Sequence, residues 1–231
     1  NIPAIGKLTQ DITEEICKDA KIKTAIEEIK SELGDKYNIE NLLSNIEQKK
    51  QIICNGVFNG LKLSDFENLI TKIKKGIQKK VSIHKEILKT KSISNVLHSD
   101  FAEWIAKANR KYPIEIFTTN YDYLLELGLE ANNVPYYDGF TGSYLPFFNA
   151  DSVEEMNFLP NQTKLWKIHG SLGWHFNKED RKVSRKDSDD EDILIYPSTL
   201  KYSDSKKQPY SSLLDRLTNF LKESDTILIA C

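Results

Sequence analysis

The chain has 231 residues, and its charge is nearly balanced, with 32 Lys+Arg against 34 Asp+Glu. Apolar residues make up 39% and charged residues 29%, which is typical of a soluble globular protein and too apolar for a disordered one. Because bulk charge is balanced, the composition argues against direct nucleic-acid binding. No long apolar run indicates a transmembrane helix, and no signal peptide is visible, so no membrane association is expected.

Three cysteines, Cys17, Cys54 and Cys231, lie far apart in the sequence. They form neither a disulfide framework nor a metal-binding knuckle, so we expect no metal and a reducing, cytoplasmic location. The chain begins at Asn1 without methionine and stops within the apolar run Thr226–Cys231. We therefore expect a fragment truncated at both ends, because a core strand rarely ends a protein.

Apolar residues recur at helical spacing through the first half of the chain. The segment that opens with Ser64–Glu67 also has the spacing of a capping box. Acidic residues are interleaved with the many lysines, which favours a helical bundle with a solvated face over a basic binding surface. The spacing predicts helices around Leu8–Ile16, Ile22–Ile29, Ile39–Ile46, Ser64–Ile77 and Ser99–Ile105, with a break at Gly34.

The second half alternates short β-rich runs with helical patterns. This alternation is typical of βαβ units and predicts an α/β fold with a parallel sheet flanked by helices. The region Asn177–Asp192 has Val183 as its one aliphatic residue among many charges, so we expect an exposed, mobile loop. The expected strands are Ile114–Thr119, Lys164–His169, Ile193–Tyr196 and Thr226–Cys231, and the expected helices begin near Leu124 and Tyr210.

Polar clusters follow two of the expected strands. Thr118, Thr119, Asn120, Tyr121 and Asp122 form the first, and His169, Gly170 and Ser171 form the second. Ligands of open parallel sheets bind outside the carboxyl ends of the strands. If the two strands are parallel, both clusters lie at the same edge of the sheet and face one crevice.

Each cluster also has a purely structural interpretation. Asn120 or Asp122 would cap the following helix, since both side chains accept from free main-chain N–H groups. His169 would be a core histidine with satisfied hydrogen bonds, and Gly170 would only permit a turn. His175 is a weaker candidate neighbour, whereas His84 and His98 have no partner at ligand spacing and are interpreted as structural. The sequence contains no CxxC, HExxH, GxSxG, Walker-type or GxGxxG pattern.

Taken together, Thr118–Asp122 and the later stretch Trp166–Ser171 resemble two motifs of the sirtuin family, T-x-N-x-D and the catalytic H-G. Ile2-Pro3-Ala4-Ile5-Gly6 resembles the end of that family's glycine-rich stretch, and Ile227–Cys231 resembles the strand before its adenosine-side loop. The resemblance implies a Rossmann-like parallel sheet in a single NAD-binding domain over residues 1–231. A large helical insertion at about 8–110 would interrupt its N-terminal half.

The sequence L-W-K-I-H-G-S-L-G-W at residues 165–174 resembles the sirtuin-like domains of bacterial anti-phage defence systems more closely than it resembles deacylase sirtuins. These defence domains destroy NAD+. Deacylase sirtuins carry four zinc cysteines after the H-G motif, whereas no cysteine lies between His169 and Cys231. This resemblance implies an NAD+ glycohydrolase without a metal, which depletes cellular NAD+ in abortive infection.

The resemblance also implies roles for the site residues. Asn120 would hold the ribose and the attacking water, and His169 would be the general base near the ribose hydroxyls. Asp122 would accept hydrogen bonds from the nicotinamide carboxamide. The expected NAD+-binding set is completed by Ile2, Pro3, Thr118, Thr119, Tyr121, Gly170 and Ser171.

Two other functions stay open at this point. One is an NAD-dependent protein deacylase, and the other is a non-catalytic nucleotide-sensing or assembly module. Resemblance to defence proteins further implies a homo-oligomer, held inactive until infection. A partner ATPase, an Argonaute-like protein or a phage-derived activator is compatible with the sequence.

Overall fold

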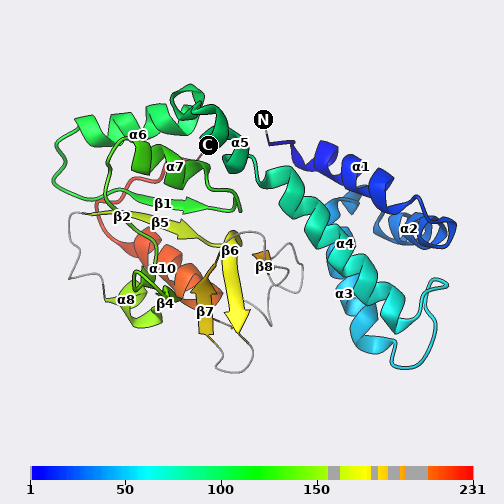
Figure 1. Ribbon diagram of the computed structural model, residues 1–231. Coiled ribbons are helices and arrows are strands. Elements are labelled where there is room, and N and C mark those ends of the chain that lie inside the picture. The colour runs from blue at the N-terminus through cyan, green and yellow to red at the C-terminus, as the bar shows by residue number, and fades with distance from the viewer. Residues whose placement is uncertain (1, 156–161, 178–181, 187–192, 196–207, 231) are drawn as a thin grey trace. The chain divides into compact units, whose positions relative to one another are not determined.

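The computed structural model describes residues 2–155, 162–177, 182–186, 193–195 and 208–230 (Figure 1). The chain divides into two compact units, and their described parts are residues 2–83 and the described residues from His84 onward. The first unit is helical and the second is mixed α/β. The sequence-based description as one domain with an insertion at about 8–110 stays a prediction.

The helical unit contains α1 (Ile5–Ile16), α2 (Ala20–Leu33), a 3-10 turn (Gly34–Lys36), α3 (Ile39–Ile52) and α4 (Leu63–Val81). These agree with the helices predicted from apolar spacing. Asp19 caps α2 by accepting from the main-chain N–H of Lys21 at 2.8 Å, and Asn38 caps α3 by accepting from that of Asn41 at 2.9 Å. The core is mainly aliphatic, and its central residues are fully excluded from solvent: Leu42, Leu43, Ile46, Phe66, Leu69 and Ile73.

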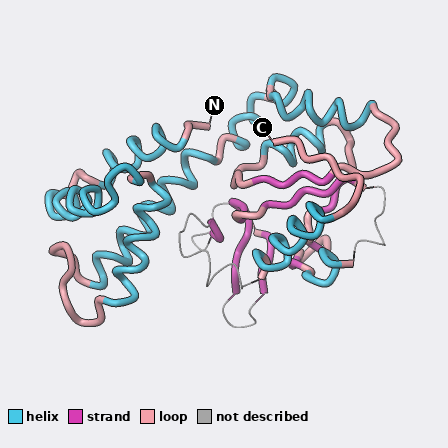
Figure 2. The backbone as a smooth tube through the Cα atoms, turned by 180° about the vertical axis from the view of Figure 1, so that it is seen from behind, coloured by secondary structure: helices cyan, strands magenta, loops and turns pink. Residues whose placement is uncertain are grey.

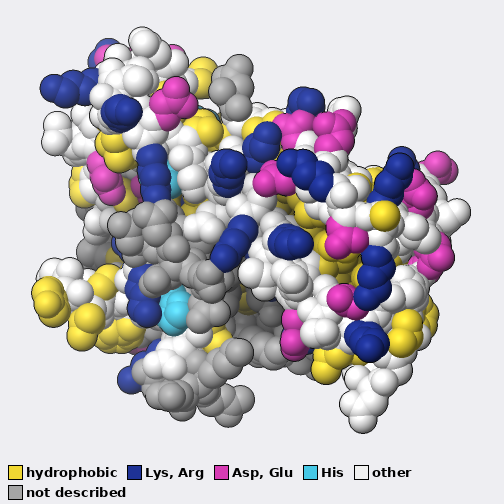
Figure 3. Space-filling view, turned by 45° about the vertical axis from the view of Figure 1, so that its right-hand side comes forward, with side chains coloured by type: hydrophobic (Ala, Val, Ile, Leu, Met, Phe, Trp, Pro, Cys, Tyr) yellow, Lys and Arg dark blue, Asp and Glu magenta, His cyan; other side chains and the backbone are white. Residues whose placement is uncertain are grey.

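The predicted capping box at Ser64–Glu67 is wrong by two residues. Helix α4 begins at Leu63, and the carboxylate of Asp65 accepts from the main-chain N–H of Lys62 at 2.9 Å. Asp65 therefore occupies the third helical position, which the prediction gave to Glu67, and Lys62 occupies the N-cap position predicted for Ser64. Lysines of this unit pair with acidic groups, as in Lys74–Glu47 at 3.0 Å, and Figure 3 shows acidic and basic side chains interspersed on the visible face.

The α/β unit is built around three parallel strands in the order β1-β5-β2. In chain order, it contains α5 (His84–Thr90), a 3-10 turn (Ile93–Asn95), α6 (Leu97–Lys107), β1 (Glu115–Thr118), α7 (Leu124–Ala131), β2 (Tyr136–Tyr137), β3 (Phe140–Thr141), β4 (Phe147–Phe148), α8 (Ala150–Glu154), β5 (Thr163–Lys167), β6 (Gly170–Asn177), β7 (Lys182–Arg185), β8 (Ile193–Ile195) and α10 (Tyr210–Lys222). This arrangement confirms the predicted α/β class and is compatible with a Rossmann-like fold.

Helices cover the parallel sheet on one face, and mixed elements cover it on the other (Figures 1 and 2). Successive residues of β5 show the division, since side chains alternate across a strand. Leu165 packs with Ala102, Ile105 and Leu129 from α6 and α7. Trp166 packs on the opposite face with Trp174 of β6, Val183 of β7 and Leu213 of α10. The sheet is therefore buried on both faces, as parallel sheets usually are.

A second, five-stranded sheet has the order β3-β4-β7-β6-β8 and is antiparallel. This sheet contains two segments for which the sequence predicted another structure. The strand at 193–195 pairs antiparallel with β6, so it does not belong to the parallel sheet. The expected loop Asn177–Asp192 contains β7 in its described part, because Val183 is buried in the core and Arg185 has an acidic partner outside that stretch of sequence. Residues 178–181 and 187–192 of the expected loop lie outside the described residues.

The predicted strand at Thr226–Cys231 is not formed within its described part, residues 226–230. The side chains of Ile227 and Ile229 are 83% and 80% exposed. An apolar run becomes a strand only where a neighbouring strand takes up its main-chain hydrogen bonds, and the described chain supplies no such neighbour to these residues.

Two helical glycines predict opposite stability effects. At Gly128 in α7, an added Cβ would lie 2.5 Å from the carbonyl oxygen of His98, so Gly128→Ala should lower the free energy of unfolding by about 1–3 kcal/mol. At Gly76 in α4, a Cβ would make ordinary contact with Ile12 at 3.4 Å, so Gly76→Ala should raise it by about 0.5–1 kcal/mol. Denaturant unfolding of both variants checks this, and equal effects of one sign would contradict the packing.

Candidate functional site

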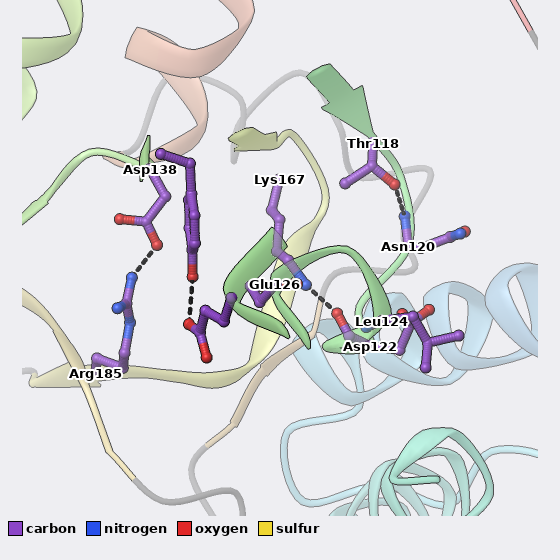
Figure 4. Close-up of polar contacts among 10 residues, drawn as sticks. Thr118, Asn120, Asp122, Leu124, Glu126, Asp138, Lys167 and Arg185 are labelled. Carbon is purple, nitrogen blue, oxygen red and sulfur yellow. Dashed lines mark hydrogen bonds and ion pairs between the residues drawn. The ribbon is translucent and has the colours of Figure 1, made fainter. Parts of the chain in front are cut away.

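The first polar cluster follows β1 at the carboxyl edge of the parallel sheet. The hydroxyl of Thr118 accepts from the main-chain N–H of Asn120 at 3.1 Å, which turns the chain as the strand ends. Thr119 and Asn120 are both exposed. In Figure 4, the Asn120 side chain extends away from the buried Lys167 ammonium, so its amide is available to a ligand at the sheet edge.

Asp122 is buried and lies one residue before Tyr123, which occupies the N-cap position of α7. Its carboxylate accepts from the main-chain N–H of Leu124, the first residue of α7, at 2.9 Å. A carboxylate at a helix N-terminus is stabilised by the free N–H groups and the helix dipole. Its expected contact with a nicotinamide carboxamide stays a prediction.

The second cluster forms the turn between β5 and β6. His169 is half-buried, and Gly170 has a φ of +96°, a backbone conformation that favours glycine. Ser171 is buried at the start of β6. The short connection sends the chain from the parallel sheet into the antiparallel one, which the sequence did not predict.

Main-chain hydrogen bonds hold the two clusters together. Thr118 pairs in register with Lys167 across the parallel strands. The N–H of Ile168 donates to the carbonyl of Thr118 at 3.0 Å, and the N–H of Leu172 donates to the carbonyl of Tyr121 at 3.0 Å. The expectation that both clusters lie at one edge of a parallel sheet is thereby confirmed.

Tyr123, which directly precedes α7, packs beside the second polar cluster. Its ring meets the ring of His84 edge-on, with centroids 4.9 Å apart, and its hydroxyl lies over Gly173 of β6. A Cβ at Gly173 would be 1.8 Å from that hydroxyl oxygen. The second glycine of the H-G-S-L-G stretch is thus needed for the close approach of Tyr123.

Lys167 is the residue of this region that the sequence analysis missed. Its side chain is 4% exposed although it carries a charge, and it follows the apolar residues Leu165 and Trp166 in β5. The ammonium donates to the main-chain carbonyl of Asp122 (Figure 4). It also lies 2.8 Å from a carboxylate oxygen of Glu126 and 5.3 Å from the centroid of the Tyr123 ring. A lysine within L-W-K-I, two residues before His169, was the available signal.

Further charged groups are buried beside Lys167. Burial raises the pKa of Glu126 above its ordinary value, while the ammonium of Lys167 opposes the rise. Burial likewise raises the pKa of Asp138, which ion-pairs with Arg185 of β7. Figure 4 shows that Asp138 and Arg185 lie away from Asn120. The Glu126–Lys167 pair connects α7 to β5, and the Asp138–Arg185 pair connects the segment after β2 to β7. Neither pair includes the exposed residues at the sheet edge.

A separate charged contact fixes α10 to the first strand. The carboxylate of Glu115 accepts from Arg216 Nε at 2.9 Å and also from the indole N–H of Trp166 at 2.8 Å. Both ionic side chains are largely buried, and the carboxylate raises the pKa of Arg216. The charge-assisted bonds orient β1 and β5 where the sheet is covered by α10.

Two residues of the predicted NAD+-binding set lie outside the α/β unit. Ile2 and Pro3 belong to the helical unit, so their part in a ligand site stays a prediction. Within the described residues, no group of three or more His, Cys, Asp or Glu side chains could hold a metal ion. Among the same residues, no helix is long and apolar enough to cross a membrane.

The SIR2-like domain family matches residues 114–231, which covers half of the chain and includes both polar clusters. The chain therefore belongs to the SIR2-like, or sirtuin-like, family. Proteins of this family are generally NAD-dependent enzymes, and SIR2-like domains use NAD+. A search of curated proteins finds no match to this chain.

The contact between Tyr123 and Gly173 predicts a measurable coupling. Gly173→Ala should lower the free energy of unfolding by about 1–3 kcal/mol, because the new methyl group overlaps the tyrosine hydroxyl. Tyr123→Phe removes that hydroxyl and leaves Cζ at 3.1 Å from the methyl group, so it should offset part of the loss. A double-mutant cycle by denaturant unfolding measures this coupling. Strictly additive effects would contradict the approach seen here.

Proposed function

We propose that this domain is an NAD+ glycohydrolase that cleaves the bond between nicotinamide and ribose. The observation that carries the proposal is the pair of main-chain hydrogen bonds that hold Thr118–Tyr121 beside Ile168–Leu172. They bring an exposed amide, Asn120, and a half-buried imidazole, His169, to one edge of a parallel sheet in a sirtuin-like domain. This edge is where such sheets bind nucleotides.

The chemistry needs few groups. Departure of nicotinamide leaves positive charge on the ribose, as in other glycosyl transfers, and the leaving group needs no strong nucleophile to displace it. Water adds to the ribose C1′ carbon as the bond to nicotinamide breaks, which gives ADP-ribose, nicotinamide and one proton. The role of the protein is to orient the ribose and the water in a partly enclosed site.

Asn120 and His169 supply this orientation in the proposal. The amide of Asn120 holds the ribose and the attacking water. His169 is the general base near the ribose hydroxyls, since an imidazole titrates close to neutral pH. Asp122 accepts from the nicotinamide carboxamide as well as from the main-chain N–H of Leu124. Thr118, Thr119 and Ser171 line the crevice.

Hydrolysis is favoured over protein deacylation by the sequence after the H-G motif. The stretch between His169 and Cys231 contains no cysteine, so it lacks the ligands for a zinc module. We place the activity in the cytoplasm, as depletion of NAD+ in anti-phage defence. Control by homo-oligomerisation and by an infection-dependent partner is part of the same proposal.

The test measures nicotinamide release and NAD+ content for the whole protein, in cells with and without phage challenge. Wild type should consume NAD+ without any acylated peptide. His169→Ala and Asn120→Ala should each reduce the rate by about 100-fold or more while remaining folded. His98→Ala, which alters a half-buried histidine on α6, is the matched control and should retain activity.

Three outcomes would contradict the proposal. Full activity in a folded His169→Ala variant would remove the assigned base. Release of nicotinamide only with an acylated peptide would indicate a deacylase. Tight NAD+ binding with no release under phage challenge would indicate a sensor.

A further inference from the structure

Lys167 carries a charge that burial makes costly. The side chain is 4% exposed, and an ammonium removed from water needs compensating hydrogen bonds. Its described partners are the Glu126 carboxylate, the Asp122 carbonyl and the face of Tyr123. All three belong to the stretch that ends the first polar cluster and begins α7, so this one side chain reaches from β5 into a single neighbouring segment.

The position of Lys167 in the chain adds to this geometry. Lys167 precedes His169 by two residues, and the carbonyl that it contacts lies two residues after Asn120. A buried ion pair adds little net stability compared with apolar packing of the same volume, and in some proteins its main effect is to select one geometry. The pair with Glu126 therefore fixes where the ammonium lies, and the ammonium in turn fixes the main chain at Asp122.

We infer that Lys167 is a positioning residue, which holds the Asn120–Asp122 main chain at a fixed distance from the His169 turn through its contact with the Asp122 carbonyl. The inference rests on the proposed hydrolase site and deepens it. Lys167 itself is enclosed by Glu126 and Tyr123 and acts through the main chain, whereas Asn120 and His169 meet the substrate. Glu126 is the second member of the device, because it holds the ammonium from the side of α7.

The test uses the whole protein with Lys167→Met and with the double variant Lys167→Met/Glu126→Leu. The double variant removes both charges, so no buried carboxylate is left unpaired. Lys164→Met is the matched control, because Lys164 is a buried lysine of the same strand. Burial lowers the pKa of Lys164, and its charged neighbours are Glu115 and Arg216. All three variants are first compared with wild type by thermal unfolding.

We expect kcat for nicotinamide release to fall by about 100-fold in both Lys167 variants, with KM for NAD+ changed by less than about threefold, since small displacements of catalytic groups have large effects on rate. Lys164→Met should retain wild-type kcat. Amide hydrogen exchange across residues 119–123 should be faster in both Lys167 variants than in Lys164→Met. This readout reports the main chain directly and needs no activity.

The inference is overturned if the folded double variant keeps wild-type kcat, or if exchange across residues 119–123 equals that of Lys164→Met. Failure of the proposed function would look different. In that case the wild-type protein would release no nicotinamide under phage challenge, while the exchange comparison would still decide whether Lys167 fixes this main chain.

Discussion

The parallel pairing of β1 with β5 is the constraint on which the site depends. Because Thr118 lies opposite Lys167 in this register, both strands end at the same level of the sheet, and the segments that follow them must leave side by side. The two hydrogen bonds beyond the strands, from Ile168 to Thr118 and from Leu172 to Tyr121, continue the pairing into the loops. A shift of one residue would separate Asn120 from the His169 turn and reverse the faces of Leu165 and Trp166.

Several buried polar contacts stabilise this register of β1 and β5. Glu115 is bonded both to Trp166 across the strand pair and to Arg216 of α10, so the first strand cannot slide without losing both partners. At the other end of the strand, Lys167 reaches the main chain that follows β1. Apolar contacts at Leu165 and Trp166 provide burial on the two faces, whereas these polar contacts select one alignment.

Much of this arrangement follows from local patterns in the sequence. Helical spacing predicted α1 to α4, α6, α7 and α10, and the β-rich runs predicted β1 and β5. Their parallel pairing followed from alternation of strands and helices, and the polar residues after each strand marked the edge where they meet. The roles of Asn120 and His169 in catalysis stay predictions that rest on family resemblance and the proposed chemistry.

The features that the sequence did not predict depend on partners distant in the chain. The strand β7 lies in a charged stretch, because Arg185 is neutralised by Asp138 and Val183 is buried by residues of other elements. Lys167 was missed for the same reason, since its carboxylate partner comes from α7. The run at residues 226–230 illustrates the reverse case, in which strong β propensity without a paired neighbour gives no strand.

The most direct test of the account follows the ribose carbon that the proposed reaction changes. NAD+ carrying carbon-13 at the C1′ atom of the nicotinamide ribose is incubated with the whole protein and followed by NMR, without acylated peptide and under activating conditions. If the domain is an NAD+ glycohydrolase with His169 as its base, the signal moves from NAD+ to ADP-ribose in step with nicotinamide release, and it stays in NAD+ with His169→Ala. A signal that remains in NAD+ with the wild-type protein would rule out hydrolysis of NAD+, and a signal that moves equally fast with His169→Ala would rule out His169 as the base.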